Sequence, residues 1–408
     1  MKKRTGPALL LAAALALSGC SSFLDQGGGN EQPTNEESRT QRPSDTSGQE
    51  VSYDNIRLPA ATAYYLDGEG ERTVNACKAI YSAMQEGRHT VDLKSFELTK
   101  GSIDPMIMLV VSTAPRLCCV QEGYSYTVGA GDKISALTVG YTVDLEEAAE
   151  MDAELLAAAQ TIIDEGEGLP DDARAKLYHD RLVRGCEYSD ESPNCYSAYG
   201  CLVEGKAVCE GYSKAYLLLC ELGGLDCLTV LGDTFENGAA TPHMWNKLCL
   251  DDEWYNVDVT WDDPITTLDI DYIRYDYYNI TDAELLRDHR FDDSGYLRSP
   301  SAEGTAWSYF GASGLLINEP AEAREIVTCA IADTASRGSD IAEVKAVNED
   351  VYSEVYEELF KGDHPEIFEI LDDAAQRSGA DFNTDKYTVL SNENQNTITL
   401  VLEMGNSE

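Results

Sequence analysis

A helical segment followed by alternating segments near the middle of the chain constrains the fold most strongly. From Cys209 onward, apolar and aromatic residues recur at helical spacing, and Gly223-Gly224 ends the run. Residues 227–232 (CLTVLG) are typical of a strand. Two alternating arms that carry aromatic residues follow at 243–250 and 253–261, which is the pattern of a β-hairpin. The sequence therefore predicts a helix, a strand and an antiparallel hairpin in succession.

Cys209 lies at the predicted start of this helix, directly after a turn that contains Gly205. The helix dipole and the unpaired N–H groups of a first turn stabilise a thiolate, which lowers the thiol pKa from its reference near about 8.5. The same N–H groups can donate to a developing oxyanion. Cys209 is therefore a candidate nucleophile. A buried, unreactive cysteine at a helix start is the alternative.

The predicted hairpin brings a histidine and a carboxylate together. A two-residue turn at Asp251-Asp252 places Trp245 opposite Asp258. His243 lies two residues before Trp245 on the same face, so His243 and Asp258 become diagonal neighbours. In thiol catalysis an imidazole acts as the general base for the thiol, and a carboxylate on the other side of the imidazole orients it. A three-residue loop would separate the two side chains, and two exposed polar residues on a hairpin are the alternative.

These motifs carry a resemblance to a known family. The segments are AYGCLVEGKAVCEGYSKAY, HMWNKL, EWYNVDVTWDDP and YYNITDAELLRDHRF. The stretch from Asp171 to His289, about 120 residues of 408, resembles the bacterial transglutaminase-like domain of the papain-like thiol superfamily, in the branch related to kyphoscoliosis peptidase. The resemblance implies an α+β fold in which the helix with the cysteine packs on an antiparallel sheet that bears the histidine and the aspartate. It implies a catalytic triad of Cys209, His243 and Asp258, with no metal or organic cofactor.

The resemblance also implies acyl transfer from peptide bonds or glutamine side chains of a protein or peptide substrate through a thioester, which then meets water or a primary amine. The sequence does not decide between these two acceptors. A catalytically silent binding or scaffold protein with the same fold is the alternative function. By family position, four residues are expected to form the walls of the substrate site, with plain packing as their alternative: Tyr199, Lys206, Trp245 and Trp261.

The N-terminal sequence predicts that the protein is located in the cell envelope. Basic residues at positions 2–4 precede the apolar run 8–17, and Leu17-Ser18-Gly19-Cys20 resembles the bacterial lipobox. We therefore expect residues 1–19 to be a signal peptide and Cys20 to be lipidated, anchoring the protein to the lipid bilayer of the cell membrane, outside the cytoplasm. An ordinary signal peptide or a buried apolar helix is the alternative. Residues 20–50 are polar and rich in Gly and Ser, as in a flexible tether.

Net charge and cysteine spacing exclude some partners. The formal charge of −43 argues against nucleic acid and against a bare anionic membrane as direct partners. The twelve cysteines contain no CxxC pair, so we expect no structural metal site. A disulfide from Cys186 to Cys195 or Cys201 is conceivable outside the cytoplasm. His179 and His364 are expected to be structural and surface residues, respectively.

Two small α/β modules are expected to flank a catalytic domain at 146–299. The first, at 51–145, is predicted to pack on or present substrate to that domain. The second, at 300–408, is predicted to dock a partner or substrate. The elements expected in the three parts are helices at 71–86 and 102–113 with strands at 117–120 and 134–143; helices at 147–165 and 170–184; and helices at 319–335, 349–360 and 364–378 with strands at 341–347, 386–391 and 396–403.

Overall fold

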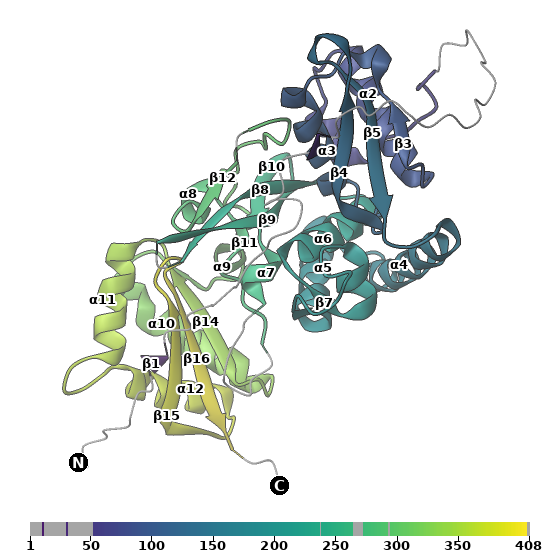
Figure 1. Cartoon of the computed structure of the whole chain (residues 1–408). Helices are drawn as coiled ribbons and strands as arrows, with labels where there is room; N and C mark the ends of the chain where they lie inside the picture. The colour runs from purple at the N-terminus through teal and green to yellow at the C-terminus, as the bar shows by residue number, and fades with distance from the viewer. Residues whose placement is uncertain are drawn as a thin grey trace. The chain divides into compact units, whose positions relative to one another are not determined.

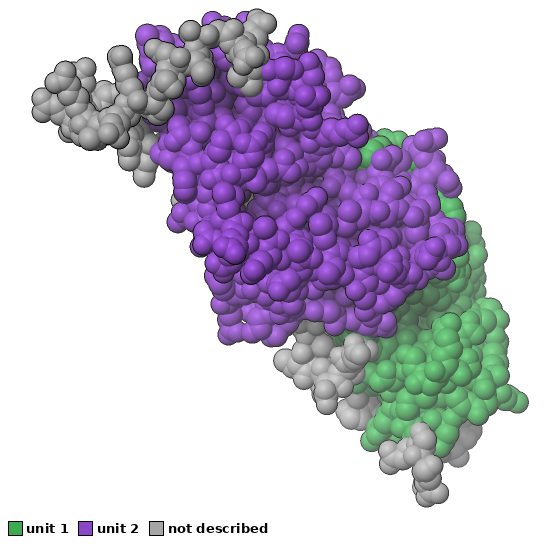
Figure 2. Space-filling model, turned by 90° about the vertical axis from the view of Figure 1, so that its right-hand side faces the viewer, with its two compact units in different colours: residues 1–18, 253–288, 302–408 green, residues 19–252, 289–301 purple. Residues whose placement is uncertain are grey.

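The computed structural model describes residues 52–405 except 237, 264–271 and 293, together with the short strands Leu10–Leu11 (β1) and Asn30–Glu31 (β2). The predicted lipidation site Cys20 lies outside the described residues, as do the signal peptide and tether apart from these four positions. The chain forms two compact units, which Figure 2 colours separately. Unit 1 comprises Met1–Ser18, Glu253–Asp288 and Ala302–Glu408, and unit 2 comprises Gly19–Asp252 and His289–Ser301.

The first part of unit 2 is a small α/β layer, drawn in purple and blue in Figure 1. Its sheet has the order β2-β4-β5-β3, and the helices α2 and α3 pack together beside it. The predicted helices and the strand near 134–143 are confirmed. The elements are α1 (Ala60–Tyr65), α2 (Glu71–Gln85), β3 (Thr90–Asp92), η1 (Lys94–Phe96), α3 (Lys100–Thr113), β4 (Val120–Val128), η2 (Ala130–Asp132) and β5 (Ile134–Tyr141).

The strand predicted at 117–120 is wrong, because Leu117 donates its N–H to Ala114 in a turn and the strand β4 starts only at Val120. Gly123 in β4 has a φ of 83°, and the register against β5 shifts between Val120 and Tyr124. A glycine bulge breaks the alternation of inward and outward side chains. Because of this break, the alternation of apolar and polar residues does not reveal β4.

The second part of unit 2 places α6 on an antiparallel pair of long strands. The strand β8 pairs with β9 from Cys227↔Leu248 to Glu236↔Ala239, and β12 pairs with the other edge of β8. The helices α4 and α5 pack on α6. The elements are α4 (Leu145–Glu165), α5 (Asp171–Gly185), β6 (Glu187–Tyr188), η3 (Gly200–Glu204), β7 (Lys206–Ala207), α6 (Cys209–Gly223), β8 (Cys227–Glu236), β9 (Ala239–Leu250) and β12 (His289–Phe291).

Unit 1 joins the second hairpin arm to the C-terminal α/β layer. Its sheet has the order β1-β15-β16-β14-β13, and α10 and α12 cover one face of it. The helices and strands predicted after residue 319 are confirmed. The elements are β10 (Glu253–Val257), α7 (Val259–Asp262), β11 (Tyr278–Ile280), α8 (Asp282–Leu285), α9 (Tyr309–Ala312), β13 (Leu316–Ile317), η4 (Pro320–Glu322), α10 (Ala323–Ser336), β14 (Ile341–Ala346), α11 (Glu349–Phe360), α12 (Ile367–Ser378), β15 (Phe382–Asn392) and β16 (Thr397–Met404).

The predicted α+β class is confirmed by these mixed helices and mainly antiparallel sheets. Within the part of the chain that the structure describes, no helix combines the length and the apolar character that a bilayer crossing requires. The domain boundaries expected at 145/146 and 299/300 stay predictions.

Candidate active site

Cys209 is the first residue of α6, and its side chain is fully buried. The preceding residue, Val208, has extended backbone angles and offers no capping side chain to the first turn. The predicted turn at Gly205 is confirmed, with a φ of 68° in the left-handed region that favours glycine. Cys209 therefore starts a helix whose first N–H groups receive no capping bond from the residue before it, a position that favours a thiolate once the cysteine is reduced.

The first turn of α6 also holds a buried ion pair. Glu210 Oε1 lies 2.7 Å from Lys214 Nζ, one turn further along the helix, and both side chains are almost entirely buried. The Lys214 Nζ also donates to the carbonyl of Tyr196 at 3.3 Å. These contacts tie the start of α6 to the segment that precedes it and fix the position of Cys209.

Gly211 explains why the motif carries glycine two residues after the cysteine. A Cβ at this position would lie 2.5 Å from the carbonyl oxygen of Cys195 and 2.7 Å from the Cβ of Ala207. Since Val208 N donates to that same Cys195 oxygen at 3.0 Å, the two segments cannot separate without losing a backbone hydrogen bond. The glycine permits the close approach of α6 to the loop before it.

Replacing Gly211 with alanine should lower the free energy of unfolding by about 1–3 kcal/mol, because the added methyl group overpacks this contact. Urea unfolding followed by circular dichroism measures the change. The matched control is Gly185→Ala at the end of α5, where a Cβ would meet nothing within 4 Å. An equal loss in both variants would contradict this account of Gly211.

His243 lies in β9 opposite Gly232 of β8, and 3% of its surface is exposed. Ser213 Oγ in α6 donates to the carbonyl of Met244 at 2.7 Å. Asn246 Nδ2 in β9 donates back to the Ser213 carbonyl at 3.1 Å. Ser213 follows Cys209 by four residues, a rise of about 6 Å along the helix axis. The bonds therefore hold the first two turns of α6 against the part of β9 that carries His243.

An aromatic group surrounds His243 in unit 2. The rings of His243 and Trp245 are stacked, with centroids 6.1 Å apart, and the His289 ring lies 5.5 Å from that of His243. His289 is fully buried and reaches this position because β12 pairs with β8. Sequence reasoning assigned His289 no role. The motif YYNITDAELLRDHRF contains His289 and could have indicated it as a site residue, but this motif lies far from Cys209 in the sequence.

Gly232 makes room for this group. A Cβ there would collide with the carbonyl oxygen of Arg290 and would lie 2.7 Å from Cη2 of Trp245. The glycine in the strand run CLTVLG thus allows β12 and the Trp245 ring to approach β8 closely.

Asp258 belongs to unit 1, where it is fully buried. The predicted strand to residue 261 is wrong, because β10 ends at Val257 and Asp258 is the N-cap of α7. Its Oδ1 accepts hydrogen bonds from the backbone of Thr260 at 3.1 Å and Trp261 at 3.2 Å. A capping aspartate ends a strand by starting a helix, which alternation alone does not reveal. One oxygen of the carboxylate is thereby held in a fixed orientation.

The turn before β10 has the predicted two residues. Asp251 has a φ of 51° and Asp252 a φ of 64°, as a type I′ turn requires, although neither is glycine. Aspartate tolerates this left-handed region better than most residues. The pairing of His243 with Asp258 that this turn implies stays a prediction.

The four expected wall residues all make intramolecular contacts. Tyr199 Oη donates to Glu154 at 2.6 Å, and this hydrogen bond raises the pKa of Tyr199 to about 12. Lys206 Nζ lies 2.8 Å from Glu191, and the hydrogen bond to that carboxylate raises the pKa of Lys206. Two tryptophans complete the set: Trp245 in the stack with His243, and Trp261 edge-on to Tyr277 at 5.1 Å.

Two other histidines and three other cysteines also carried an expectation from the sequence. His179 is fully buried with Nδ1 3.0 Å from Asp180, and His364 is exposed, as expected. The bridge considered from Cys186 is not formed, since neither it nor Cys195 or Cys201 is disulfide-bonded.

Comparison with known proteins places the central segment in a family. Residues 158–259 match the model of the transglutaminase-like superfamily. The kyphoscoliosis peptidases of Mus musculus and Homo sapiens are each 28% identical in an alignment of 100 residues, and the match covers 22% of this chain and 15% of theirs. The chain thus matches only about 15% of the length of these curated relatives.

Two solved structures are also similar. A TGase has 17% identity and a TM-score of 0.26, with 37% of this chain and 46% of that chain covered. A candidate cysteine protease from Cytophaga hutchinsonii has 15% identity and a TM-score of 0.23, with 31% and 51% covered. The family match alone indicates a transglutaminase-like domain in the central part of the chain, and residues 158–259 include the motifs around Cys209, His243 and Asp258.

Proposed function

We propose that this protein is a thiol enzyme that cleaves or transfers acyl groups from peptide or glutamine amides. In this proposal Cys209 is the nucleophile, His243 the general base, and Asp258 the carboxylate that orients the imidazole. One observation carries the proposal: Cys209 starts α6, and hydrogen bonds hold that helix against β9 beside His243. The family match, which spans all three residues, supports it.

The proposed reaction has two halves. His243 takes the proton of the Cys209 thiol, and the thiolate attacks the amide carbonyl while N–H groups of the first turn of α6 donate to the oxyanion. The C–N bond breaks, His243 returns the proton to the departing amine, and a thioester remains. Water then yields an acid, or a primary amine yields a new amide, and the thiol is regenerated in either case.

The acceptor depends on the surroundings of the thioester. Hydrolysis requires water near Cys209, whereas transamidation requires that water be excluded and an amine be bound. The proposed substrate is a protein or peptide of the cell envelope. This location rests on the lipobox-like residues around Cys20, which would attach the protein to the membrane through lipid.

Alkylation by iodoacetamide tests whether Cys209 is activated. After reduction, we expect Cys209 at pH 6.5 to react at least about tenfold faster than an ordinary thiol, since a thiol with a lowered pKa is already ionised there. Mass spectrometry of peptides from the full-length protein gives the rate at each cysteine. The rate at Cys209 should titrate below pH 8.5 and fall in His243→Ala.

Cys329 provides an internal control for this experiment. Cys329 is exposed on α10. Partial desolvation of its sulfur, followed by a hydrogen bond to Glu325, nevertheless raises the pKa of Cys329. It should therefore react slowly at pH 6.5 despite its accessibility. If Cys209 reacts no faster than Cys329 and its rate shows no titration below pH 8.5, the enzyme assignment fails and a scaffold or binding protein becomes the better description.

A further inference from the structure

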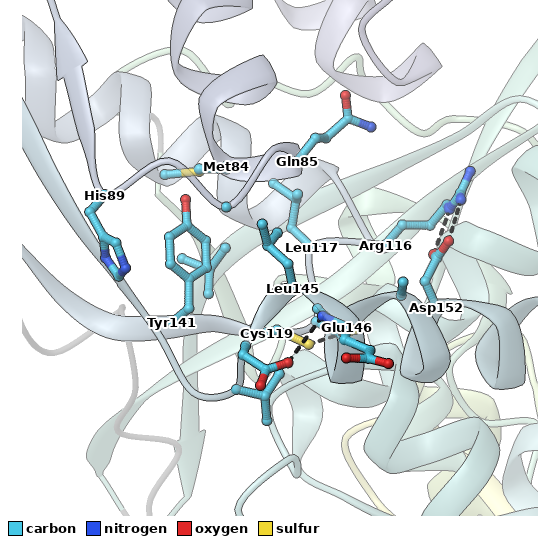
Figure 3. Close-up of a pocket in the computed structure, with 17 residues that line it drawn as sticks. Met84, Gln85, His89, Arg116, Leu117, Cys119, Tyr141, Leu145, Glu146 and Asp152 are labelled. Atoms are coloured by element: carbon cyan, nitrogen blue, oxygen red, sulfur yellow. Dashed lines mark hydrogen bonds and ion pairs between the residues drawn. The ribbon is translucent and has the colours of Figure 1, made fainter.

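A large cavity in the N-terminal part of unit 2 has no role in the proposed reaction. Its volume is about 990 Å³, and it lies between the end of α2, the segment before β4, the end of β5 and the start of α4 (Figure 3). Cavities of this size accept small ligands. Its wall contains the adjacent cysteines Cys118 and Cys119.

Three sulfur atoms meet at this wall. The Sγ atoms of Cys118 and Cys119 are 3.5 Å apart, and Cys119 Sγ lies 3.6 Å from the Sδ of Met151 on α4. Cys119 and Met151 are buried, Cys118 is half-buried, and neither cysteine is disulfide-bonded. Cys119 and Met151 are 32 positions apart in the sequence, and the fold brings their sulfurs together.

An arginine and an aspartate lie beside the sulfurs. Arg116 lies close enough for its charge to act on Cys118, and Asp152 holds it in place through two hydrogen bonds, one of 2.8 Å from Nε. Figure 3 shows this Arg116–Asp152 pair on the cavity wall.

We propose that Cys118, Cys119 and Met151 form a binding site for a thiophilic monovalent metal ion, Cu(I). Thiolate and thioether sulfurs select Cu(I), whereas structural zinc takes four thiolate or imidazole donors. Three sulfurs at about 2.3 Å from one ion lie about 4.0 Å from one another, so the separations of Cys119 Sγ from its two neighbours, 3.5 and 3.6 Å, would each open by a few tenths of an ångström.

Binding changes the protonation of the site without any redox step. Two thiols and Cu(I) give a bis-thiolate complex and two released protons, and the Met151 thioether adds a neutral donor. The resulting single negative charge lies near the Arg116 guanidinium. The cavity provides the entry path for the ion, since both cysteines face it.

Competition with the Cu(I) chelator bicinchoninate tests the site in the reduced full-length protein under anaerobic conditions. We expect the wild type to take one more equivalent of Cu(I) than Cys118→Ser or Cys119→Ser. Met151→Leu, which conserves volume, should bind about tenfold more weakly. The control Cys329→Ser should match the wild type, because Cys329 lies on α10 in unit 1.

X-ray absorption at the copper edge of the wild-type complex keeps the proposal testable if a cysteine variant does not fold. A first shell of three sulfurs near about 2.3 Å is expected. A shell dominated by nitrogen or oxygen, unchanged stoichiometry in both cysteine variants, or wild-type affinity in Met151→Leu would each overturn the three-sulfur site.

Discussion

Cys209→Ser should reduce amide turnover by at least about 1000-fold, since loss of the nucleophile removes the covalent pathway. Serine nearly preserves the volume of the buried side chain, so the fold should survive. Its hydroxyl has a far higher pKa than a thiol, and the start of α6 cannot ionise it. Release of amine from a library of glutamine and peptide amides measures the rate in the full-length, reduced protein.

Two comparisons separate chemistry from folding. Cys329→Ser changes an exposed thiol in unit 1 and should retain wild-type turnover. Urea midpoints of Cys209→Ser and wild type should agree closely. Turnover of Cys209→Ser within tenfold of the wild type would remove Cys209 from the role of nucleophile, whatever the labelling rates show. Adding a primary amine to the wild-type assay then distinguishes transamidation from hydrolysis by the mass of the product.

The helix that bears Cys209 was predictable because its signals are local. Apolar residues at helical spacing define α6, Gly205 takes the left-handed turn before it, and Gly224 takes the same conformation at its end, with a φ of 74°. The position of His243 in β9 follows from alternation in the same way. Each of these signals depends on residues within a few positions of one another.

Features that depend on distant residues were not predictable. His289 joins His243 only because β12 pairs with the far edge of β8, and Met151 meets Cys119 only because α4 lies close to the segment before β4. Asp258 illustrates a different limit, since an aspartate within an alternating run can either continue a strand or cap a helix. Hydrophobic periodicity does not distinguish these two structures. The sequence therefore indicated Asp258 as a site residue but did not predict its role as a helix cap.

Glu343 is a buried acid, and hydrophobic periodicity likewise does not predict its burial. It lies in β14 with its Oε1 accepting a hydrogen bond from Thr399 at 3.2 Å. Burial, followed by the nearby negative charge of Asp276, raises the pKa of Glu343 from 4.5 to about 8, although Arg274 acts in the opposite direction. The folded protein therefore holds Glu343 protonated at neutral pH, whereas the unfolded chain ionises it.

This difference makes unit 1 less stable as pH rises. Below pH 4.5 both states are protonated and Glu343 has no effect, while between about 4.5 and 8 only the unfolded state loses the proton, which favours unfolding. The loss reaches roughly 5 kcal/mol at most. Glu343→Gln removes the ionisable group, so it should stabilise the protein by about 3 kcal/mol at pH 7 and by almost nothing near pH 4.

Urea midpoints at pH 4 and pH 7, with hydrogen exchange of the β14 amides as a readout of unit 1, measure this dependence. The matched control is Glu354→Gln on an exposed face of α11, which should change stability by less than about 0.5 kcal/mol at either pH. A Glu343→Gln variant that is less stable than the wild type at pH 7 would show that the carboxyl is ionised in the folded state. In that case Arg274 would outweigh both burial and Asp276, and the ionised Glu343 would contribute to the stability of the sheet.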